Sequence, residues 1–295
     1  MDAGLLYALL TACIWAAVGC GYGAAARRRL AMAPFVAVAA SVGALIGVSC
    51  TIRWAGLPAW REAVPVAAFI AMSGATGQMG MLLNGAAMTV APRQSSATWS
   101  IFQMSMIVPF LVSNLSGREH AAWYKWPALL FVLLALRAFK SKSGQAEDSA
   151  ANGKGWFGLL LVAFVCAGIA QALAQEISLR GLHDTLNLRT TVTLGAGGML
   201  LWIVTFLRGE RPTPRHWLLG GLTGLLVAAG NVTLFVALDA CALHGRAYMV
   251  FPIAVAGSIL LFAVYQVASG KEPCGIRKIL GVACSVAGVA LLGVR

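Results

Sequence analysis

Charged side chains are scarce in this chain of 295 residues. Asp, Glu, Lys and Arg together make up 11% of it, whereas hydrophobic residues make up 59% and the mean hydropathy is +0.80. A soluble domain carries about a quarter charged residues. The composition therefore excludes an ordinary soluble protein and predicts one that lies in a lipid bilayer.

Sequence motifs of enzymatic chemistry are missing as well. The chain has no HExxH, nucleophile elbow, P-loop or dinucleotide-binding fingerprint, and its four histidines are scattered. Its seven cysteines form no CxxC pair and no Cys/His cluster, so we expect them to be small core residues. We expect no catalytic residue, no metal site and no cofactor, and we expect that the protein is not an enzyme.

Acidic residues are few: the chain has 10 Asp and Glu against 22 Lys and Arg, which gives a net charge of +12. The basic residues lie in short segments between apolar runs, where membrane proteins place them to set topology. No basic stripe interleaved with aromatic residues is present, so we expect no nucleic-acid partner. About two thirds of the lysines and arginines fall in the odd-numbered connections between apolar runs. This bias predicts that residues 141–154 are cytoplasmic and that both termini lie outside.

Ten apolar runs are present, each long enough to cross a bilayer, which takes about 20 residues in a helix. They cover residues 4–25, 32–52, 64–89, 94–115, 122–139, 155–177, 187–207, 216–239, 246–268 and 276–294. The polar stretch 141–154 separates five runs from five. The sequence therefore predicts an all-α integral membrane fold of ten transmembrane helices. Its parts are an N-terminal five-helix repeat (1–140), a polar linker (141–154) and a C-terminal five-helix repeat (155–295).

The second half repeats part of the first. Shifting residues 77–125 by 153 positions aligns them with residues 230–278 without a gap, and 8 of the 49 aligned residues are identical. The matches include turn and charged residues, which apolar composition does not force to recur: Gly77 with Gly230, Arg93 with Arg246, Ser116-Gly117 with Ser269-Gly270, Glu119 with Glu272, and Lys125 with Lys278. We interpret the chain as a duplication.

Five spans in each half require the second half to enter the membrane from the opposite side. Inverted repeats of this kind are common in transporters and place a binding site near the midplane, between the halves. Two equivalent packings of such a pair, each open to one side, would give alternating access. Three pairs of small residues predict close helix contacts, unless they only reflect the abundance of glycine. These pairs are Gly19 with Gly23, Ser73 with Gly77, and Gly220 with Gly224.

Polar side chains inside the spans are the candidates for solute binding. They are costly in a bilayer unless they face a cavity or a partner. Amide and aromatic residues suit a hydrated pocket, and we expect these to bind substrate: Trp15, Gln78, Asn84, Trp99, Gln103, Asn231 and Tyr248. Trp99, Gln103 and Met106 share one face of a continuous helix. Hydrogen bonding between helices is the alternative role for the same residues.

Charged residues at span ends add three candidates. Arg93 and Arg246 occupy matching positions of the duplication, where each is either a topology residue or one of a symmetric pair that binds an anionic group of the substrate. Glu176, near the end of the sixth span, is the candidate for proton coupling. Arg180 lies four residues later and could simply pair with it.

These features together resemble the ten-helix, EamA-like branch of the drug/metabolite transporter superfamily. The resemblance is carried by Pro109 with Gly117-Arg118-Glu119 and Lys125, and by Pro252 with Gly270-Lys271-Glu272 and Lys278. It implies a central cavity lined mainly by the third, fourth, eighth and ninth spans, with contributions from the first and sixth. In both turns an additional residue separates Gly from Glu. Trp15 lies in the region where four-helix multidrug members carry an embedded Glu, so antiport of cationic drugs is not expected.

We therefore expect a secondary transporter that moves a small polar metabolite, such as an amino acid, sugar or organic acid, by alternating access. The alternatives are a drug or toxic-metabolite exporter and a lipid-headgroup flippase. The expected partners are a small-molecule solute and the lipid bilayer, with a homodimer left open. The expected location is the cell membrane as a multi-pass protein, in the bacterial inner membrane.

Overall fold

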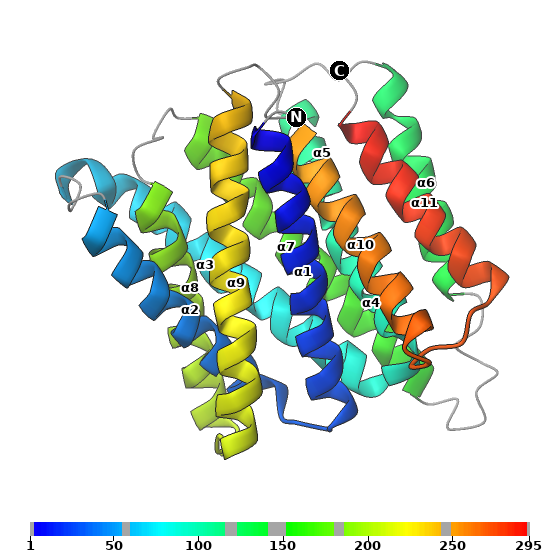
Figure 1. Ribbon diagram of the computed structural model, residues 1–295, viewed down its shortest axis with the longest axis horizontal. Coiled ribbons are helices and arrows are strands. Elements are labelled where there is room, and N and C mark those ends of the chain that lie inside the picture. The colour runs from blue at the N-terminus through cyan, green and yellow to red at the C-terminus, as the bar shows by residue number, and fades with distance from the viewer. Residues whose placement is uncertain are drawn as a thin grey trace.

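The computed structural model describes residues 3–54, 60–115, 123–140, 152–179, 186–242 and 249–293, and every element in these ranges is a helix (Figure 1). The α-helices are α1 (Ala3–Arg27), α2 (Met32–Trp54), α3 (Trp60–Val90), α4 (Ser95–Gln103), α5 (Ile107–Leu115), α6 (Pro127–Lys140), α7 (Asn152–Leu179), α8 (Leu186–Leu207), α9 (Pro214–Ala242), α10 (Val250–Ala268) and α11 (Ile276–Leu292). Short 3-10 helices are η1 (Pro92–Gln94), η2 (Met104–Met106) and η3 (Trp123–Lys125). The all-α prediction is confirmed.

Seven segments of the described chain are long and apolar enough to cross a membrane. They are Ala3–Arg27, Met32–Ser49, Pro92–Val112, Gly155–Ala174, Arg189–Leu207, Pro214–Ala237 and Val250–Ala268. The other three expected spans fall on α3, α6 and α11, of which α6 has 14 residues and α11 has 17. The structure is that of an all-α, multi-pass membrane protein, and the full number of ten spans stays a prediction.

The fourth expected span is interrupted. The sequence predicts one helix over residues 94–115, but α4 ends at Gln103, a 3-10 turn covers Met104–Met106, and α5 begins at Ile107. Pro109 has no backbone N–H to donate to the carbonyl of Ser105, which removes an α-helical hydrogen bond at this point. A 3-10 stretch inside a longer helix often marks a functional hinge.

Basic residues recur in the described turns at one end of the helix bundle. We call this end the basic side and define it by the connections 28–31, 91–94, 208–213 and 269–275. Arg27, at the end of α1, donates to Gln266, near the end of α10, at 3.4 Å. Glu272, which follows α10, is hydrogen-bonded to Ser96 at the start of α4. At the other end of the bundle, α1 begins and α11 ends (Figure 1).

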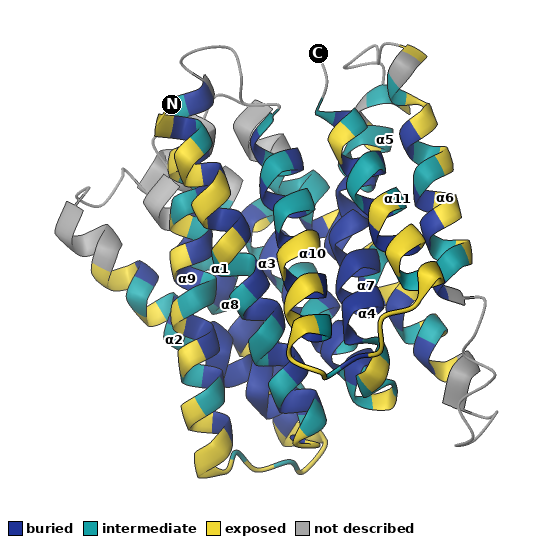
Figure 2. Ribbon diagram, turned by 45° about the vertical axis from the view of Figure 1, so that its right-hand side comes forward, coloured by how far each residue is buried: buried dark blue, intermediate teal, exposed yellow. Residues whose placement is uncertain are grey.

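Helices from the two halves of the chain pack mainly against each other. Helix α3 packs against α7 and α8, α9 packs against α1 and α2, α2 also packs against α8, and α6 packs against α11. Figure 2 shows buried residues concentrated between the helices and exposed ones on the outer faces of helices such as α10 and α11. The hydrophobic core therefore lies between the halves rather than within each of them.

The small residues predicted to mark helix contacts do so, as three of them illustrate. A methyl group placed on Gly224 in α9 would lie 2.4 Å from the backbone oxygen of Ala39 in α2. One on Gly77 in α3 would lie 3.3 Å from the Cβ of Ala170 in α7, and one on Gly19 in α1 would lie 3.1 Å from the indole of Trp99. The prediction of close packing is thus confirmed, because lipid-embedded helices associate where small residues let backbones approach.

Candidate functional site

Three neighbouring helices each carry a buried polar group that has no hydrogen-bond partner among the described residues. These groups are both amide atoms of Asn84, the indole Nε1 of Trp99 and the amide oxygen of Gln171. They come from α3, α4 and α7, three helices that pack against one another. A buried polar group without a partner is rare in native proteins, and each one calls for an explanation such as a bound ligand or water. Together these atoms offer both donors and acceptors.

Asn84 is the clearest case, since its residue is 0% exposed. Burying an amide without compensating hydrogen bonds costs about 1–3 kcal/mol on mutational scales. The sequence predicted Asn84 as a binding residue. Its amide has no hydrogen-bond partner among the described residues, and its role in binding stays a prediction.

We expect Asn84→Leu to raise the stability of the unliganded protein by about 1–3 kcal/mol, because an apolar side chain of similar volume removes the unpaired amide. The measurement is the thermal melting temperature of purified protein in detergent. Asn84→Ala is the matched control: it also removes the amide but leaves a cavity, so it should melt below Asn84→Leu. A melting temperature of Asn84→Leu below wild type would mean that the amide already has a partner, such as a buried water.

Trp99 is packed on several sides. It is 1% exposed, and its ring lies 5.8 Å from that of Phe262 and 6.0 Å from that of Phe102. The backbone of Gly19 approaches the same indole. The aromatic faces are therefore covered by protein, and the unpartnered Nε1 is the part of Trp99 left for a polar ligand.

The interrupted fourth span supplies two further polar residues. Gln103, the last residue of α4, is 6% exposed and has no hydrogen-bond partner among the described residues. Ser105, in the 3-10 turn, accepts a hydrogen bond from the Nε2 of Gln171 at 3.1 Å. Broken helices are where many transporters hold their substrates, because unwound backbone and nearby side chains can turn toward a cavity. Gln171, a polar residue of the sixth span, is not among the individual substrate-binding residues predicted above.

Two predicted residues lie at other helix interfaces. Gln78 is buried against α8, where a methyl group on Gly197 would come within 2.2 Å of its Cγ. Trp15 lies over Gly230 of α9, next to the half-buried Asn231. No hydrogen bond joins Gln78, Asn84 and Gln103 in the described part of the chain. The predicted side chains are therefore spread over several helix contacts.

The remaining predicted residues are exposed or not described. Arg93 lies in η1, exposed on the basic side. Tyr248 and Arg246 lie outside the described residues, so the symmetric arginine pair stays a prediction. Glu176 belongs to α7, but its side chain is outside the described part, and its role in proton coupling also stays a prediction.

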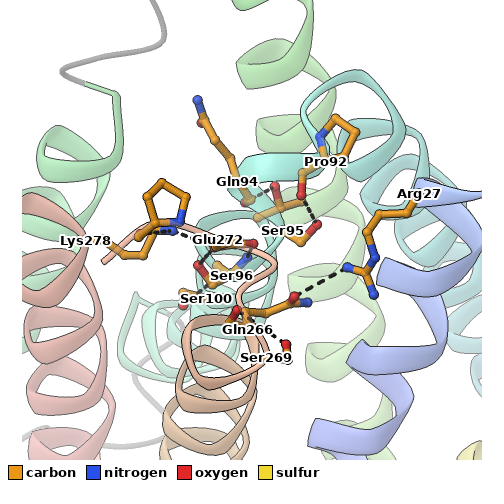
Figure 3. Close-up of polar contacts among 12 residues, drawn as sticks. Arg27, Pro92, Gln94, Ser95, Ser96, Ser100, Gln266, Ser269, Glu272 and Lys278 are labelled. Carbon is orange, nitrogen blue, oxygen red and sulfur yellow. Dashed lines mark hydrogen bonds and ion pairs between the residues drawn. The ribbon is translucent and has the colours of Figure 1, made fainter. Parts of the chain in front are cut away.

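The most fully connected polar cluster lies on the basic side and centres on Glu272 (Figure 3). The Glu272 side chain is 0% exposed. Its Oε1 accepts from the backbone N–H of Ser96 at 2.8 Å, and its Oε2 accepts from the Ser96 hydroxyl and from the Lys278 ammonium, the latter at 2.7 Å. We call Glu272, Ser96 and Lys278 the clasp.

The turn after α10 explains how Glu272 reaches this position. Gly270 adopts a left-handed conformation (φ 66°), which glycine accepts without strain, and it ends the helix. The backbone N–H groups of Lys271 and Glu272 then both donate to the carbonyl of Gln266, at 3.0 and 3.1 Å. This turn directs the Glu272 carboxylate back onto the first turn of α4, where helix N–H groups lack partners and the helix dipole favours a negative charge.

The clasp joins the two halves of the chain. Ser96 belongs to the first half, whereas Glu272 and Lys278 belong to the second. The hydrogen bond from Arg27 to Gln266 adds a further link between the halves on the same side. In the sequence, Glu272 and Lys278 stand out only as markers of the duplication and of a turn that resembles the family's. The counterpart residues 116–120 lie outside the described part of the chain.

In the described part of the chain, no three His, Cys, Asp or Glu side chains lie close enough together to hold a metal ion. Interior polar groups in α3, α4 and α7 are uncharged amides, hydroxyls and an indole. They can bind a polar solute by hydrogen bonding.

Comparisons with known proteins bear on the fold alone. No protein-family model and no curated protein sequence matches the chain. Among solved structures, one described only as "Crystal structure of protein" superposes with a TM-score of 0.66 at 16% sequence identity, over 98% of this chain and 96% of the other. The two chains thus share an overall fold along nearly their whole length.

Proposed function

We propose that the protein is a secondary transporter that moves a small polar metabolite across the membrane by alternating access. We place it in the ten-helix, EamA-like branch of the drug/metabolite transporter superfamily, with ten spans arranged as two inverted five-helix repeats. The observation that carries the proposal is the group of unpartnered polar atoms around the interrupted fourth span. Such atoms are rare in a packed interior, and a bound polar solute would supply the hydrogen-bond partners that they lack.

The course of the helices supports an inverted arrangement. Helix α1 begins opposite the basic side, because its Gly4 lies against Cys241 near the end of α9. Helix α7, the first of the second half, begins on the basic side, because its Trp156 donates to Thr98 near the start of α4 at 3.0 Å. The first helices of the two halves therefore run in opposite directions.

Equivalent positions of the duplication also have equivalent neighbours. Gly77 in α3 faces Ala170 in α7, and the aligned Gly230 in α9 faces Trp15 in α1. Helices α7 and α1 occupy the same place in their respective halves. Exchanging the two halves thus preserves these contacts, which is the property that allows two alternative packings of one transporter.

The clasp supports a closed state on the basic side. It fixes the start of α4 to the turn between α10 and α11 with a buried ion pair and two hydrogen bonds. In alternating access these halves separate on one side at a time, so the clasp must break when the basic side opens. The clasp is proposed as the latch of this side.

The test is a thermal-shift screen of purified protein against amino acids, sugars, nucleosides and organic acids. A ligand at 100 times its Kd should stabilise the folded protein by about 2.7 kcal/mol. The shift should be lost in Gln103→Ala and in Asn231→Ala, while the unliganded melting temperature changes little. Uptake or exchange of the identified ligand by proteoliposomes then tests transport itself.

Thr205→Ala is the matched control for this screen. The Thr205 hydroxyl is buried but bonds only to the Leu201 carbonyl of its own helix, at 2.7 Å. Its loss should leave the ligand-induced shift intact. A ligand that stabilises wild type, Gln103→Ala and Asn231→Ala equally would place the binding site elsewhere, and a protein that binds but never moves the ligand would contradict transport.

A further inference from the structure

A pocket on the basic side lies apart from the interior polar groups and from the clasp. It has a volume of about 470 Å³ and is formed where the turn between α1 and α2 meets the start of α9. Its lining consists of Arg29, Leu30, Ala31, Thr213, Pro214, Arg215 and His216. The proposed transport function does not use any of these residues.

Positive charge dominates the pocket. Arg29 and Arg215 are both exposed and line it from opposite elements. The pocket also meets the N-terminus of α9, a helix of 29 residues, whose first N–H groups carry partial positive charge. One carboxylate, that of Glu210, lies near His216 and 4.0 Å from Arg208, and the two arginines of the lining outnumber it. An anion is therefore the ligand that this pocket favours.

His216 adds a buried donor. The backbone N–H of Thr213 donates to its Nδ1 at 3.0 Å, so the ring carries its proton on Nε2. The residue is 4% exposed, and Nε2 lies beside the backbone carbonyl of Ala31, at a geometry short of a full hydrogen bond. His216 therefore adds a polar N–H group to the lining of the basic pocket.

Arg29 occupies a backbone conformation that normally requires glycine. Its φ is 53°, and it follows the end of α1, where a left-handed residue closes the helix. A non-glycine residue here costs free energy relative to glycine. Replacing Arg29 by glycine would therefore remove the guanidinium and relieve this backbone cost at the same time.

Aromatic residues place the pocket at the depth of lipid headgroups. Trp202 stacks on Phe206 at 5.9 Å and lies 6.3 Å from Trp217, which directly follows His216. Phe206 and Trp217 are largely exposed on the outer surface of the bundle. Tryptophan and other aromatic residues gather at the membrane–water interface. The pocket therefore opens where the phosphates of the bilayer lie.

We propose that this pocket binds the phosphate of an anionic phospholipid headgroup, between Arg29, Arg215 and the start of α9. Basic pockets between transmembrane helices on the cytoplasmic side bind headgroups of this class. The phosphate accepts from the two guanidinium groups and from the backbone N–H of Arg215 in the first turn of α9, while the acyl chains lie against the exposed aromatic surface of α8 and α9.

The experiment measures the melting temperature of detergent-purified protein with added dioctanoyl phosphatidylglycerol, dioctanoyl phosphatidylcholine or sodium phosphate. Phosphatidylglycerol should raise the melting temperature by several degrees, and phosphatidylcholine should not. The shift should disappear in Arg215→Gln and in Arg29→Gly. Because Arg29→Gly also relieves the backbone strain, its lipid-free melting temperature should equal or exceed that of wild type. Folding failure therefore cannot account for the lost shift.

Arg28→Gln is the matched control, since Arg28 is also exposed and adjacent in sequence but does not line the pocket. It should keep the full phosphatidylglycerol shift. A shift that persists in Arg29→Gly and Arg215→Gln, or one that phosphatidylcholine reproduces, would overturn the proposal. If sodium phosphate alone gives the arginine-dependent shift and the lipid does not, the pocket binds free phosphate, and the proposal of a phospholipid headgroup is wrong.

Discussion

Replacing Glu272 by alanine is expected to destabilise the protein by about 3–5 kcal/mol, the usual cost of removing one partner from a buried ion pair. The substitution leaves the N–H and hydroxyl of Ser96 without their acceptor and the Lys278 ammonium without its counter-charge. Thermal melting in detergent measures the effect. Glu210→Ala is the control, because Glu210 is partly exposed and 4.0 Å from Arg208, and such pairs contribute less than about 1 kcal/mol.

A second substitution, Glu272→Gln, tests whether the clasp opens during function or only stabilises the fold. Glu272→Gln keeps an oxygen that can accept from Ser96 but loses the attraction to Lys278, so it weakens the clasp without leaving a cavity. If the clasp is a latch, Glu272→Gln should make the half-buried Cys20 of α1 accessible to a membrane-impermeant maleimide. The already exposed Cys274 is the internal reference for labelling. Unchanged labelling of Cys20 together with a lowered melting temperature would show that the clasp only stabilises the fold.

Gly224→Ala should destabilise the protein by about 1–3 kcal/mol, the range for overpacking a close contact. The new methyl group would lie 2.4 Å from the backbone oxygen of Ala39 and 3.1 Å from its Cα. Backbone atoms of α2 cannot move aside as a flexible side chain would, so α2 and α9 must separate along their contact. Melting temperature and the yield of folded, monodisperse protein both report this effect.

Gly221→Ala provides a control of opposite sign on the same helix. Nothing lies within 4 Å of a methyl group at Gly221. Alanine is favoured over glycine inside a helix by about 1 kcal/mol, so this variant should equal wild type or exceed it in stability. If both variants lose stability equally, the loss comes from the helix itself, and the close approach of α2 is not its cause.

The course of the helices could be predicted from the sequence because it depends on local signals. The expected run 32–52 corresponds to α2 (Met32–Trp54), and 216–239 corresponds to α9 (Pro214–Ala242). Apolar run length, set by bilayer thickness, and the charged turns between runs were sufficient for this. The 3-10 turn at Met104–Met106 was not predicted, although Pro109, four residues after Ser105, was the signal for it.

The candidate site was predicted only in part, because tertiary contacts decide which polar groups find partners. Asn84 and Trp99 were predicted and do lie buried with unpaired atoms. Gln78, another amide residue that was predicted to bind substrate, packs against α8 instead. The clasp was missed because Glu272 and Ser96 are 176 positions apart, and no local pattern joins them. The recurrence of a Glu after each Ser-Gly turn was the available hint that this carboxylate has a packing role.

The interruption of the fourth span has no equivalent in α10, which aligns with it in the duplication and runs unbroken through 19 residues. Ser105 accepts from Gln171 at the break, whereas the aligned Ser258 donates to the Val255 carbonyl of its own helix. Two unequal halves give two conformers of unequal free energy, and every 1.4 kcal/mol of difference changes their ratio tenfold. If the protein is the carrier proposed above, the empty form should spend most of its time facing one compartment, and the apparent affinity measured from the two faces of the membrane should differ.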